Sequence, residues 1–479
     1  MALIVQKYGG TSVGSVERIE HVADKIAAFR AAGHKVVVVV SAMSGETNRL
    51  MELATAIDPH PNGRELDVLL STGEQVTIAL LTMALHKRDL AARSFTGGQV
   101  RILTDMAHNK ARIVDIDKQR VSDALAADEV VVVAGFQGID ERGNITTLGR
   151  GGSDTTAVAL AAALQADECQ IYTDVDGVYT ADPNICPKAR KLSAISYDEM
   201  LNMASLGAKV LQIRSVGFAK KYKIPVHVRS SFSQKEGTMV VDENSGMERL
   251  VVSAVTHDKD QARITLKKVP DKPGIAAKIF TPIADAGIVV DMIIQNTRAE
   301  GQTDLTFSVP KASFKQALEM QKKIAADIGA EDVFGDENIA KVSVIGVGMK
   351  DHSGVASKMF NALARENINI IMISTSEIKI SVVVDEKYLE LGVRSLHDAF
   401  ELQHIRVVQQ PVERLNVVRV AAQVRGDEDA VGRLGCGGCR RNEHEQCSQT
   451  HALPLVASTG QRSASSRARS CPPTVKWRR

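Results

Sequence analysis

The stretch KVVVVVSAM, residues 35–43, decides the fold class of this chain. Five consecutive valines leave no polar face, so the segment predicts a strand that is covered on both sides, as in a parallel sheet. The segment EVVVVAGF, residues 129–136, has the same character. Segments with helical periodicity lie around these runs, such as residues 16–33. Residues 1–245 therefore predict an α/β domain with a central, mostly parallel sheet.

The overall composition argues against several classes of protein. The chain has 479 residues, of which 44% are hydrophobic and 24% charged, and its formal net charge is only +2. That balance does not indicate a nucleic-acid or membrane surface. No apolar run approaches the ~20 residues of a membrane helix, and the first run ends at Lys7, too early for a signal peptide. We therefore expect a cytoplasmic protein with more than one domain and no disulfide framework.

A glycine-rich turn follows the first predicted strand. It reads VQKYGGTSVGS, residues 5–15, and a helix is predicted to begin near Ser15. Paired glycines let a ligand approach the backbone, and successive amides can bind an anion. Lys7 would stand at the carboxyl end of the strand, where open α/β sheets bind ligands. An ordinary turn before a capped helix fits the same residues, so this stretch alone leaves both interpretations open.

A second glycine-rich loop reads TTLGRGGSDTTA, residues 146–157. Arg150 stands among three glycines and could bind a carboxylate through its two parallel N–H groups. Asp154 could be only the N-cap of the helix that follows. Three glycines around one arginine exceed what a cap requires, which favours a binding function.

Further polar segments allow either a structural or a binding function. VSAMSGETNRL, residues 40–50, places hydroxyls and amides after a buried strand. Glu74 in STGEQV is expected at a helix start, where it could complete a capping box or bind an ammonium group. The aspartates of residues 172–184 lie among turn signals. Lys209 fits the solvated face of a helix.

An internal repeat occupies the second half of the chain. The segments that begin at Asp271 and Asp351 align without a gap at an offset of 80 residues. Each copy predicts a strand, a helix and two further strands, a split βαβ unit. We assign these modules to residues 262–335 and 341–401. Gly346 and Gly348 suggest a dinucleotide motif, but Asp351 stands where its third glycine would be.

The last segment, residues 402–479, has a different character. It is rich in Arg, Ser, Gly and Cys and lacks apolar periodicity, so we expect it to be disordered. It is either a shifted reading frame or a genuine extension. Its Cys436, Cys439, His444 and Cys447 could bind zinc, although only two residues separate His444 from Cys447.

Taken in order, the motifs KYGGTS, VSAMSGETN, STGEQV, TLGRGGSDTTA, YTDVDGVYTADP and SLGAKVL, followed by the tandem repeat, resemble the aspartokinase family. The resemblance covers residues 1–400. It implies an αβα sandwich like that of amino acid kinases, followed by two α+β modules similar to ACT domains. The implied enzyme uses ATP and Mg²⁺ to phosphorylate the side-chain carboxylate of L-aspartate. That reaction would begin lysine, threonine and methionine biosynthesis, including the diaminopimelate route. A related kinase with another amino-acid acceptor, or a sensor without activity, are the alternatives.

The resemblance also implies a role for each motif residue, with no metal held by the protein itself. The implied catalytic residues are Lys7, Asp154 and Lys209. The implied ATP contacts are Lys7, Tyr8, Gly9, Gly10, Ser41, Thr173, Asp174, Tyr179, Asp182 and Lys209. The implied acceptor contacts are Thr47, Glu74, Arg150, Gly151, Gly152 and Ser153.

The modules are implied to be regulatory. Members of the family pair these modules across a homodimer or higher oligomer and bind lysine, threonine or both. Some also make a separate regulatory subunit from an internal start, for which Met247 is the candidate. The implied effector contacts are Asp271, Lys272, Pro273, Gly274, Ile275, Gln295, Asn296, Asn367, Ile368, Asn369, Ser374, Thr375 and Ser376.

Overall fold

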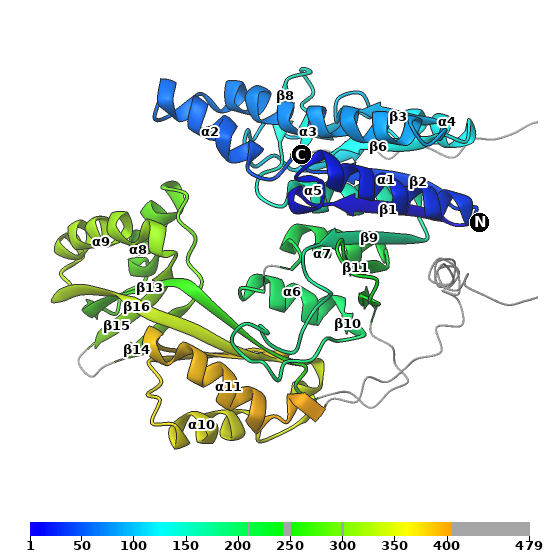
Figure 1. Cartoon of the computed structure of the whole chain (residues 1–479). Coiled ribbons are helices and arrows are strands. Elements are labelled where there is room, and N and C mark those ends of the chain that lie inside the picture. Colours follow the sequence, from blue (N-terminus) through cyan, green and yellow to red (C-terminus); the bar gives the residue numbers. More distant parts are fainter. Residues whose placement is uncertain (209, 243–250, 298–300, 405–479) are drawn as a thin grey trace, which may run out of the picture. The chain divides into compact units, whose positions relative to one another are not determined.

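The computed structural model describes residues 1–208, 210–242, 251–297 and 301–404 (Figure 1). The described strands form an eight-stranded, a six-stranded and a four-stranded sheet. The eight-stranded and four-stranded sheets belong to the first half of the chain, and the six-stranded sheet belongs to the repeat. The predicted fold class, an α/β domain with a mostly parallel sheet followed by α+β modules, is confirmed.

The eight-stranded sheet is the predicted parallel sheet. Its strand order is β10-β12-β11-β9-β1-β2-β6-β3, and every neighbouring pair is parallel except β11 with β12. The valines at 36–40 are all fully buried, which confirms a strand covered on both faces. The strand bounds are β1 Leu3–Tyr8, β2 Lys35–Val40, β3 Ala92–Phe95, β6 Val130–Ala134, β9 Glu168–Thr173, β10 Ala194–Ser196, β11 Val226–Ser230 and β12 Thr238–Val241.

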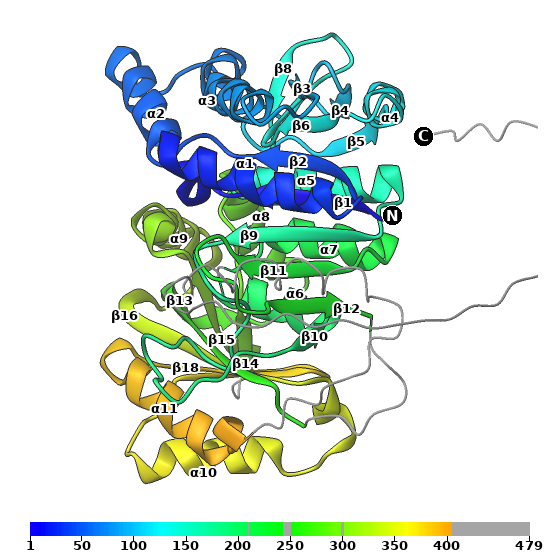
Figure 2. The same ribbon diagram turned by 45° about the vertical axis from the view of Figure 1, so that its right-hand side comes forward.

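Helices cover both faces of this sheet because side chains alternate along each strand. Val36 packs in one core with α1 (Val16–Ala31) and α3 (Gly63–His86). Val37 packs in the opposite core with α5 (Gly152–Leu164) (Figure 2). The other helices of that second core are α4 (Gln119–Ala126), α6 (Tyr197–Ser205) and α7 (Ile213–Tyr222). The result is the predicted αβα sandwich.

Helix α3 is long and apolar enough to cross a membrane, by length and composition alone. More than half of its apolar window is buried within the protein, as in the core helix of a globular domain. Its first residue is Gly63, and the Asn62 side chain caps it by accepting a hydrogen bond from the Arg64 amide. The helix therefore packs, together with α1, against one face of the eight-stranded sheet.

The four-stranded sheet leads the chain into the second glycine-rich loop. Its order is β5 (Ile113–Ile116), β4 (Ile102–Thr104), β7 (Gln137–Ile139) and β8 (Ile145–Thr147). β7 and β8 form a hairpin, and β8 ends two residues before Gly149. The remaining helix of this half, α2 (Glu46–Ile57), begins directly after the loop that follows β2.

The two modules share the six-stranded antiparallel sheet, in the order β14-β15-β13-β16-β18-β17. α8 packs with α9 in the first module and α10 with α11 in the second (Figure 1). The strand bounds are β13 Ala254–Pro270, β14 Ile293–Thr297, β15 Gln302–Val309, β16 Asp332–Ile345, β17 Met372–Thr375 and β18 Lys379–Asp385. The helix bounds are α8 Ile275–Asp285, α9 Phe314–Ile328, α10 Val355–Arg365 and α11 Leu389–Ala399.

Strand β13 serves both modules, which the repeat alone does not predict. Its first residues, Ala254 to Asp258, pair with Ile345 to Lys341 of β16 and so complete the second module. Its later residues pair with β15 of the first module. The predicted module ranges, 262–335 and 341–401, omit that first stretch because the first module separates it from its partners in sequence.

Candidate active site

The turn after β1 brings Lys7 against the start of α5. Lys7 Nζ lies 2.6 Å from Asp154 Oδ1, and both side chains are about nine-tenths buried, with 11% and 12% exposed. The contact is an ion pair and not an aligned hydrogen bond. Gly151 and not Asp154 is the N-cap of α5, so the capping interpretation of Asp154 is wrong. The two glycine-rich loops therefore meet through a nearly buried pair of opposite charges.

The glycines of the first turn permit this close packing. A Cβ atom on Gly10 would lie only 2.9 Å from the Ala42 carbonyl oxygen, in the loop that follows β2. The Gly9 amide donates to the Tyr172 carbonyl at 3.3 Å. α1 begins at Val16, and its cap residue Ser15 accepts from the Arg18 amide, as expected. The turn is thus fixed on both sides by the carboxyl ends of neighbouring strands.

A cavity of about 340 Å³ opens beside the Lys7–Asp154 pair. It collects residues from five separate segments of the sequence, which the motif order alone does not place together. The predicted site residues that line it are Lys7, Gly10, Ser41, Thr47, Glu74, Arg150, Gly151, Gly152, Ser153 and Asp154. Lining residues absent from the predicted site are Ala42, Met43, Ser44, Gly45, Asn48 and Phe136.

Glu74 is a buried acid in the wall of this cavity. It lies eleven residues, about three turns, after the first residue of α3 and not at a helix start, so the capping interpretation is wrong. One carboxylate oxygen, Oε1, accepts from the Ala42 amide at 3.1 Å, and the other has no partner within the described structure. Burial raises the pKa of Glu74 to about 8. An unpaired buried carboxylate oxygen suits a cationic ligand group, because an ammonium would restore the missing partner.

Arg150 extends from the loop between β8 and α5. The flanking Gly149 and Gly151 both adopt positive φ, +78° and +71°. L-residues with a side chain rarely adopt such angles, so the glycines set the path of the loop. Arg150 is exposed and lines the cavity, and it forms no ion pair with any described residue. Its guanidinium is therefore available to a carboxylate ligand.

Phe136 lines the cavity although no sequence motif pointed to it. Its φ is +68°, which is unusual for a bulky side chain. Its amide donates to Thr156 Oγ1 at 3.2 Å, and its carbonyl accepts from the Leu148 amide at 2.8 Å. Strained backbone of this kind persists where the surroundings hold it, often at ligand sites. No local sequence signal predicts such an angle for phenylalanine.

The predicted nucleotide residues after β9 lie on the segment that begins at the carboxyl end of this strand. Thr173 ends β9, and its hydroxyl donates to the Asp174 carboxylate at 3.1 Å. Tyr179 forms an isolated bridge with Lys191, and Asp182 accepts from the Asn184 amide. These residues do not line the 340 Å³ cavity. Lys209 lies outside the described residues.

Tyr8 does not offer its side chain to this site. Alternation along β1 places its ring on the opposite face from Lys7, fully buried and stacked on Tyr172 at 4.6 Å between ring centroids. The prediction that Tyr8 contacts ATP is therefore wrong for the side chain and can hold only for the backbone. Burial raises the pKa of the Tyr172 hydroxyl to about 12, as expected for a core phenol.

The predicted effector residues fall on exposed parts of both modules. Residues 271–274 form an exposed loop before α8, and Gln295 and Asn296 are exposed on β14. Ser374 and Thr375 lie on β17. β14 and β17 are the two edge strands of the sheet, so their outer backbone groups lack a strand partner within it.

The other predicted effector residues of the second copy follow α10. Asn367 and Asn369 are exposed, and Ser376 is exposed beyond the end of β17. Ile368 is only 4% exposed in the core of the second module, so the prediction that it binds effector is wrong for its side chain. Ile275 packs partly against the core of the first module.

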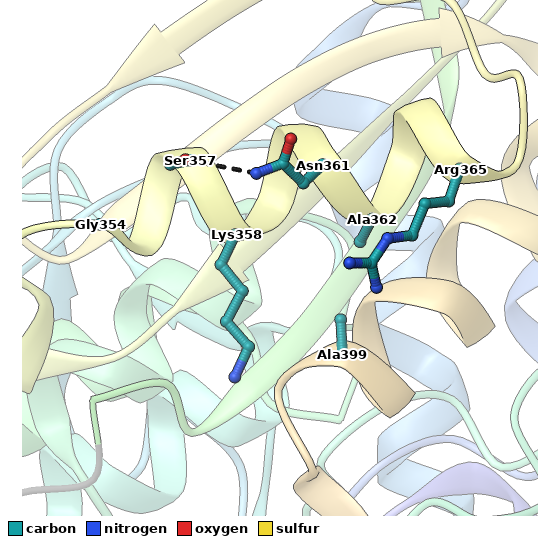
Figure 3. Close-up of a pocket in the computed structure, with 7 residues that line it drawn as sticks. All are labelled: Gly354, Ser357, Lys358, Asn361, Ala362, Arg365 and Ala399. Carbon is teal, nitrogen blue, oxygen red and sulfur yellow. Dashed lines mark hydrogen bonds between the residues drawn. The ribbon is translucent and has the colours of Figure 1, made fainter.

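A second hollow, of about 410 Å³, lies along α10 of the second module (Figure 3). Lys358 and Arg365 border it, and Ala362 and Ala399 contribute small side chains. Its lining contains no carboxylate, and Lys358 Nζ lies 5.3 Å from the centre of the Phe400 ring. The hollow has a basic rim but none of the fixed, buried charges of the first cavity.

The part of the chain that the structure describes holds no group of three or more His, Cys, Asp or Glu side chains arranged for a metal ion. Cys169 and Cys186 are buried and free. The four cysteines and the histidine considered for zinc lie outside the described residues, as does Met247.

The sandwich, its two glycine-rich loops and the paired modules define an amino acid kinase with ACT domains. A model described as the amino acid kinase family matches residues 2–230, and ACT domain models match residues 263–326 and 342–400. An aspartokinase of Pseudomonas aeruginosa is 63% identical over 404 residues, covering 84% of this chain and 98% of that protein. The chain belongs to the aspartokinase family. It is therefore an enzyme of the transferase class.

Solved structures share the fold. E. coli aspartokinase III in complex with aspartate and ADP is 27% identical, with a TM-score of 0.70 over 83% of this chain and 99% of that one. The same E. coli protein in complex with lysine and aspartate gives a TM-score of 0.65 at 27% identity, with the same coverage. The alignments leave about a sixth of this chain unmatched.

Proposed function

We propose that the protein transfers the γ-phosphoryl group of ATP to the side-chain carboxylate of L-aspartate, giving 4-phospho-L-aspartate. The observation that carries this proposal is the single cavity that joins the Lys7–Asp154 pair to Glu74 and Arg150. Support comes from the E. coli relative whose complex contains aspartate and ADP.

The residues present suit a reaction between two anions. A carboxylate with an ordinary pKa near ~4 is ionised at neutral pH, so the acceptor needs no strong general base. The need is to offset repulsion and to align the reactants. The Lys7 ammonium supplies positive charge at the cavity, and the nearby Gly10 amide is the donor we expect to face the phosphates. Asp154 fixes the position of the ammonium.

Two groups would orient the acceptor. Glu74 would bind the α-ammonium through its unpaired oxygen, and Arg150 would bind the α-carboxylate with two parallel hydrogen bonds. With both ends held, the side-chain carboxylate of aspartate points toward Lys7. Thr47, Gly151, Gly152 and Ser153 line the rest of this acceptor subsite.

ATP and Mg²⁺ fit the residues that are present. The glycine turn and Lys7 form a cationic cradle for phosphates, and Thr173, Asp174, Tyr179, Asp182 and Lys209 are the proposed contacts for the rest of the nucleotide. The ion would be held mainly by the nucleotide, because Mg²⁺ usually binds through substrate phosphates and one or two carboxylates. Mg²⁺ would supply further charge neutralisation at the transferring phosphoryl group.

We also propose regulation by lysine, threonine or both through the modules of a homodimer or higher oligomer, in a cytoplasmic enzyme without nucleic-acid or membrane partners. A relative has been solved with lysine, and edge strands β14 and β17 carry four of the predicted effector residues, Gln295, Asn296, Ser374 and Thr375. The enzyme would begin lysine, threonine, methionine and diaminopimelate synthesis. Met247 would start a shorter regulatory subunit.

A hydroxamate assay with ATP and aspartate tests the activity directly. We expect aspartyl hydroxamate to form only when both substrates are present, and glutamate to compete poorly. Lysine and threonine, added singly and together, test the effectors in the same assay. Absence of product above background would refute the proposed reaction, and efficient use of glutamate would refute the acceptor.

A further inference from the structure

Helix α3 carries a second buried carboxylate that the proposed reaction does not use. Asp67 is fully buried and lies seven residues before Glu74. Seven residues are two helical turns, so the two acids share a face about 10 Å apart along the axis. Glu74 lines the acceptor cavity, whereas Asp67 is absent from its lining.

Asp67 holds two segments that are distant in sequence. Its Oδ1 accepts from the Thr147 hydroxyl at 2.5 Å and from the Asn109 amide at 3.1 Å. Its Oδ2 lies 2.7 Å from Nδ1 of His108, a side chain that remains 23% exposed. Thr147 is the last residue of β8. Both oxygens of a fully buried acid are thus committed to the loop at 105–111 and to the strand that leads to Arg150.

Backbone contacts carry this constraint into the Arg150 loop. The Ala111 amide donates to the Thr147 carbonyl at 2.9 Å. Gly149 packs so closely on the same loop that a Cβ atom would lie 2.9 Å from the Asn109 carbonyl oxygen. A displacement of Asn109 or Thr147 would therefore move Gly149 and, with it, the neighbouring guanidinium.

Arg214 secures the same two segments through their carbonyl groups. Its guanidinium donates to the Leu148 carbonyl at 2.7 Å and to the Ala111 carbonyl at 2.9 Å. Asp67 and Arg214 thus each bond both the loop at 105–111 and the segment that ends in Arg150. This arrangement fixes the backbone and leaves the Arg150 side chain exposed.

We propose that Asp67 is a positioning residue for the acceptor site. It holds Asn109 and Thr147 so that the Gly149–Gly151 loop presents Arg150 to the α-carboxylate of the acceptor. α3 would then govern both ends of the acceptor, directly through Glu74 and indirectly through Asp67. The identity of the acceptor rests on the proposed function, whereas the packing of Asp67 against the loop does not.

The decisive variant is Asp67→Asn in the full chain. The amide keeps the size of the side chain but replaces one acceptor oxygen with a donor, so it opposes one of the bonds to Thr147, Asn109 or His108. Because a misplacement of 1 Å can cost about 100-fold, we expect KM for aspartate to rise about 10- to 100-fold. KM for ATP should stay unchanged.

Asp140→Asn is the matched control. Asp140 is also buried, at 2% exposed, and accepts from the amides of Arg142 and Asn144. It organises the tip of the β7–β8 hairpin, at the opposite end of β8 from Gly149. This variant should keep the wild-type KM for aspartate, even if its melting temperature falls.

A double variant separates positioning from general damage. If Asp67 acts through Arg150, adding Asp67→Asn to Arg150→Ala should raise KM for aspartate by less than about twofold, because the effects of residues coupled through one backbone segment are not additive. Additive effects would overturn the proposal. So would an Asp67→Asn enzyme with a normal KM for aspartate and only a lower melting temperature or kcat.

Thr147→Val keeps the experiment decisive if Asp67→Asn does not fold. It removes one donor to Asp67 and leaves the acid in place, so KM for aspartate should rise in the same direction by a smaller factor. A normal KM in a folded Thr147→Val enzyme would then overturn the proposal. A wild-type enzyme that makes no product from aspartate would instead refute the proposed function, which keeps the two failures distinct.

Discussion

The cavity beside Lys7 and the segments predicted to bind effectors differ in how their polar groups are held. Lys7, Asp154 and Glu74 are almost buried, with ion-pair or hydrogen-bond partners that fix them before any ligand arrives. The predicted effector residues Gln295 and Asn296 are exposed on an edge strand. The cavity groups are therefore held in place before any ligand arrives, whereas the polar side chains of the edge strand are open to solvent.

The two modules also differ from each other despite their matched sequences. The core of the first contains only residues of its own range, 262–328. The core of the second includes Ala181, Ile185 and Cys186, from the segment that follows the predicted nucleotide residues. A buried hydrogen bond of 3.0 Å joins Thr180 to His397 of α11. The second module is therefore built in part from the catalytic half of the chain.

Lys7→Ala should have the largest effect of these substitutions, because it should lower turnover at the cavity and leave the modules unchanged. Loss of a fixed charge at the transferring phosphoryl group should lower kcat about 100- to 1,000-fold. Effector binding, measured by calorimetry, should persist because the modules are untouched. Lys35→Ala, at the opposite end of the neighbouring strand β2, is the control and should retain activity. Unchanged turnover in Lys7→Ala would contradict the assignment of Lys7.

Glu74→Gln should remove a pH dependence from aspartate binding. Since the pKa of Glu74 is about 8, the free enzyme carries a mostly neutral acid at pH 6.5 and a carboxylate at pH 9. Wild-type KM for aspartate should therefore fall as pH rises to about 8 and then level. Loss of a charged hydrogen bond should raise KM about 10- to 100-fold at pH 9.

Glu74→Gln should also remove the destabilisation that a buried, charged Glu74 causes at high pH. A folded pKa above the unfolded value means that the folded state binds more protons, so the contribution of Glu74 to stability declines from pH 4.5 through about 8. Relative to wild type, Glu74→Gln should gain stability at pH 9 compared with pH 6, measured by thermal unfolding. Parallel KM and stability profiles for the two proteins would count against a buried, titrating Glu74.

Asn296→Ala tests whether the exposed loops bind effectors. We expect the effector concentration for half-inhibition to rise about 5- to 20-fold, within the usual range of coupling energies, with kcat little changed. Ser376→Ala, at the matched position of the second module, should shift it less because a hydroxyl forms fewer hydrogen bonds than an amide. Equal inhibition of all three proteins would remove Asn296 from the effector site.

Thr180→Val should have the smallest effect, on stability. Removing the hydroxyl leaves His397 Nε2 and the Arg190 amide, its two partners, without this hydrogen bond and should cost about 1–3 kcal/mol in free energy of unfolding. Urea denaturation measures this cost, and Thr55→Val on the exposed side of α2 is the control. Burial also lowers the pKa of His397, so its contribution to stability is lost as pH falls below the unfolded value. A wild-type unfolding curve for Thr180→Val would show that the bond contributes nothing.

The valine runs and the repeat made the fold predictable because they are local patterns with fixed periods. The run Val36–Val40 favoured a strand covered on both faces, and the 80-residue offset marked two copies of one unit. The sequence did not predict that the first stretch of β13 belongs to the second module, because its partners lie far along the chain. Pairing between distant strands leaves no signal in a single segment.

The site was predictable as a set of motifs but not as a geometry. Lys7 and Arg150 stand out because glycines surround charges. The depth of Glu74 within α3 and the left-handed backbone of Phe136 depend on tertiary packing, which overrides local signals. Asp67 looks like an ordinary polar position until Thr147 and Asn109 are brought to it.

Because β13 belongs to both modules, it limits where a fragment that contains the complete second module can begin. A fragment that begins at residue 262 would keep both repeats as the sequence defines them, yet the second would lack its fourth strand. A fragment that begins at Met247 would include all of β13, which starts at Ala254. A shorter product with a complete second module would therefore have to begin upstream of residue 254.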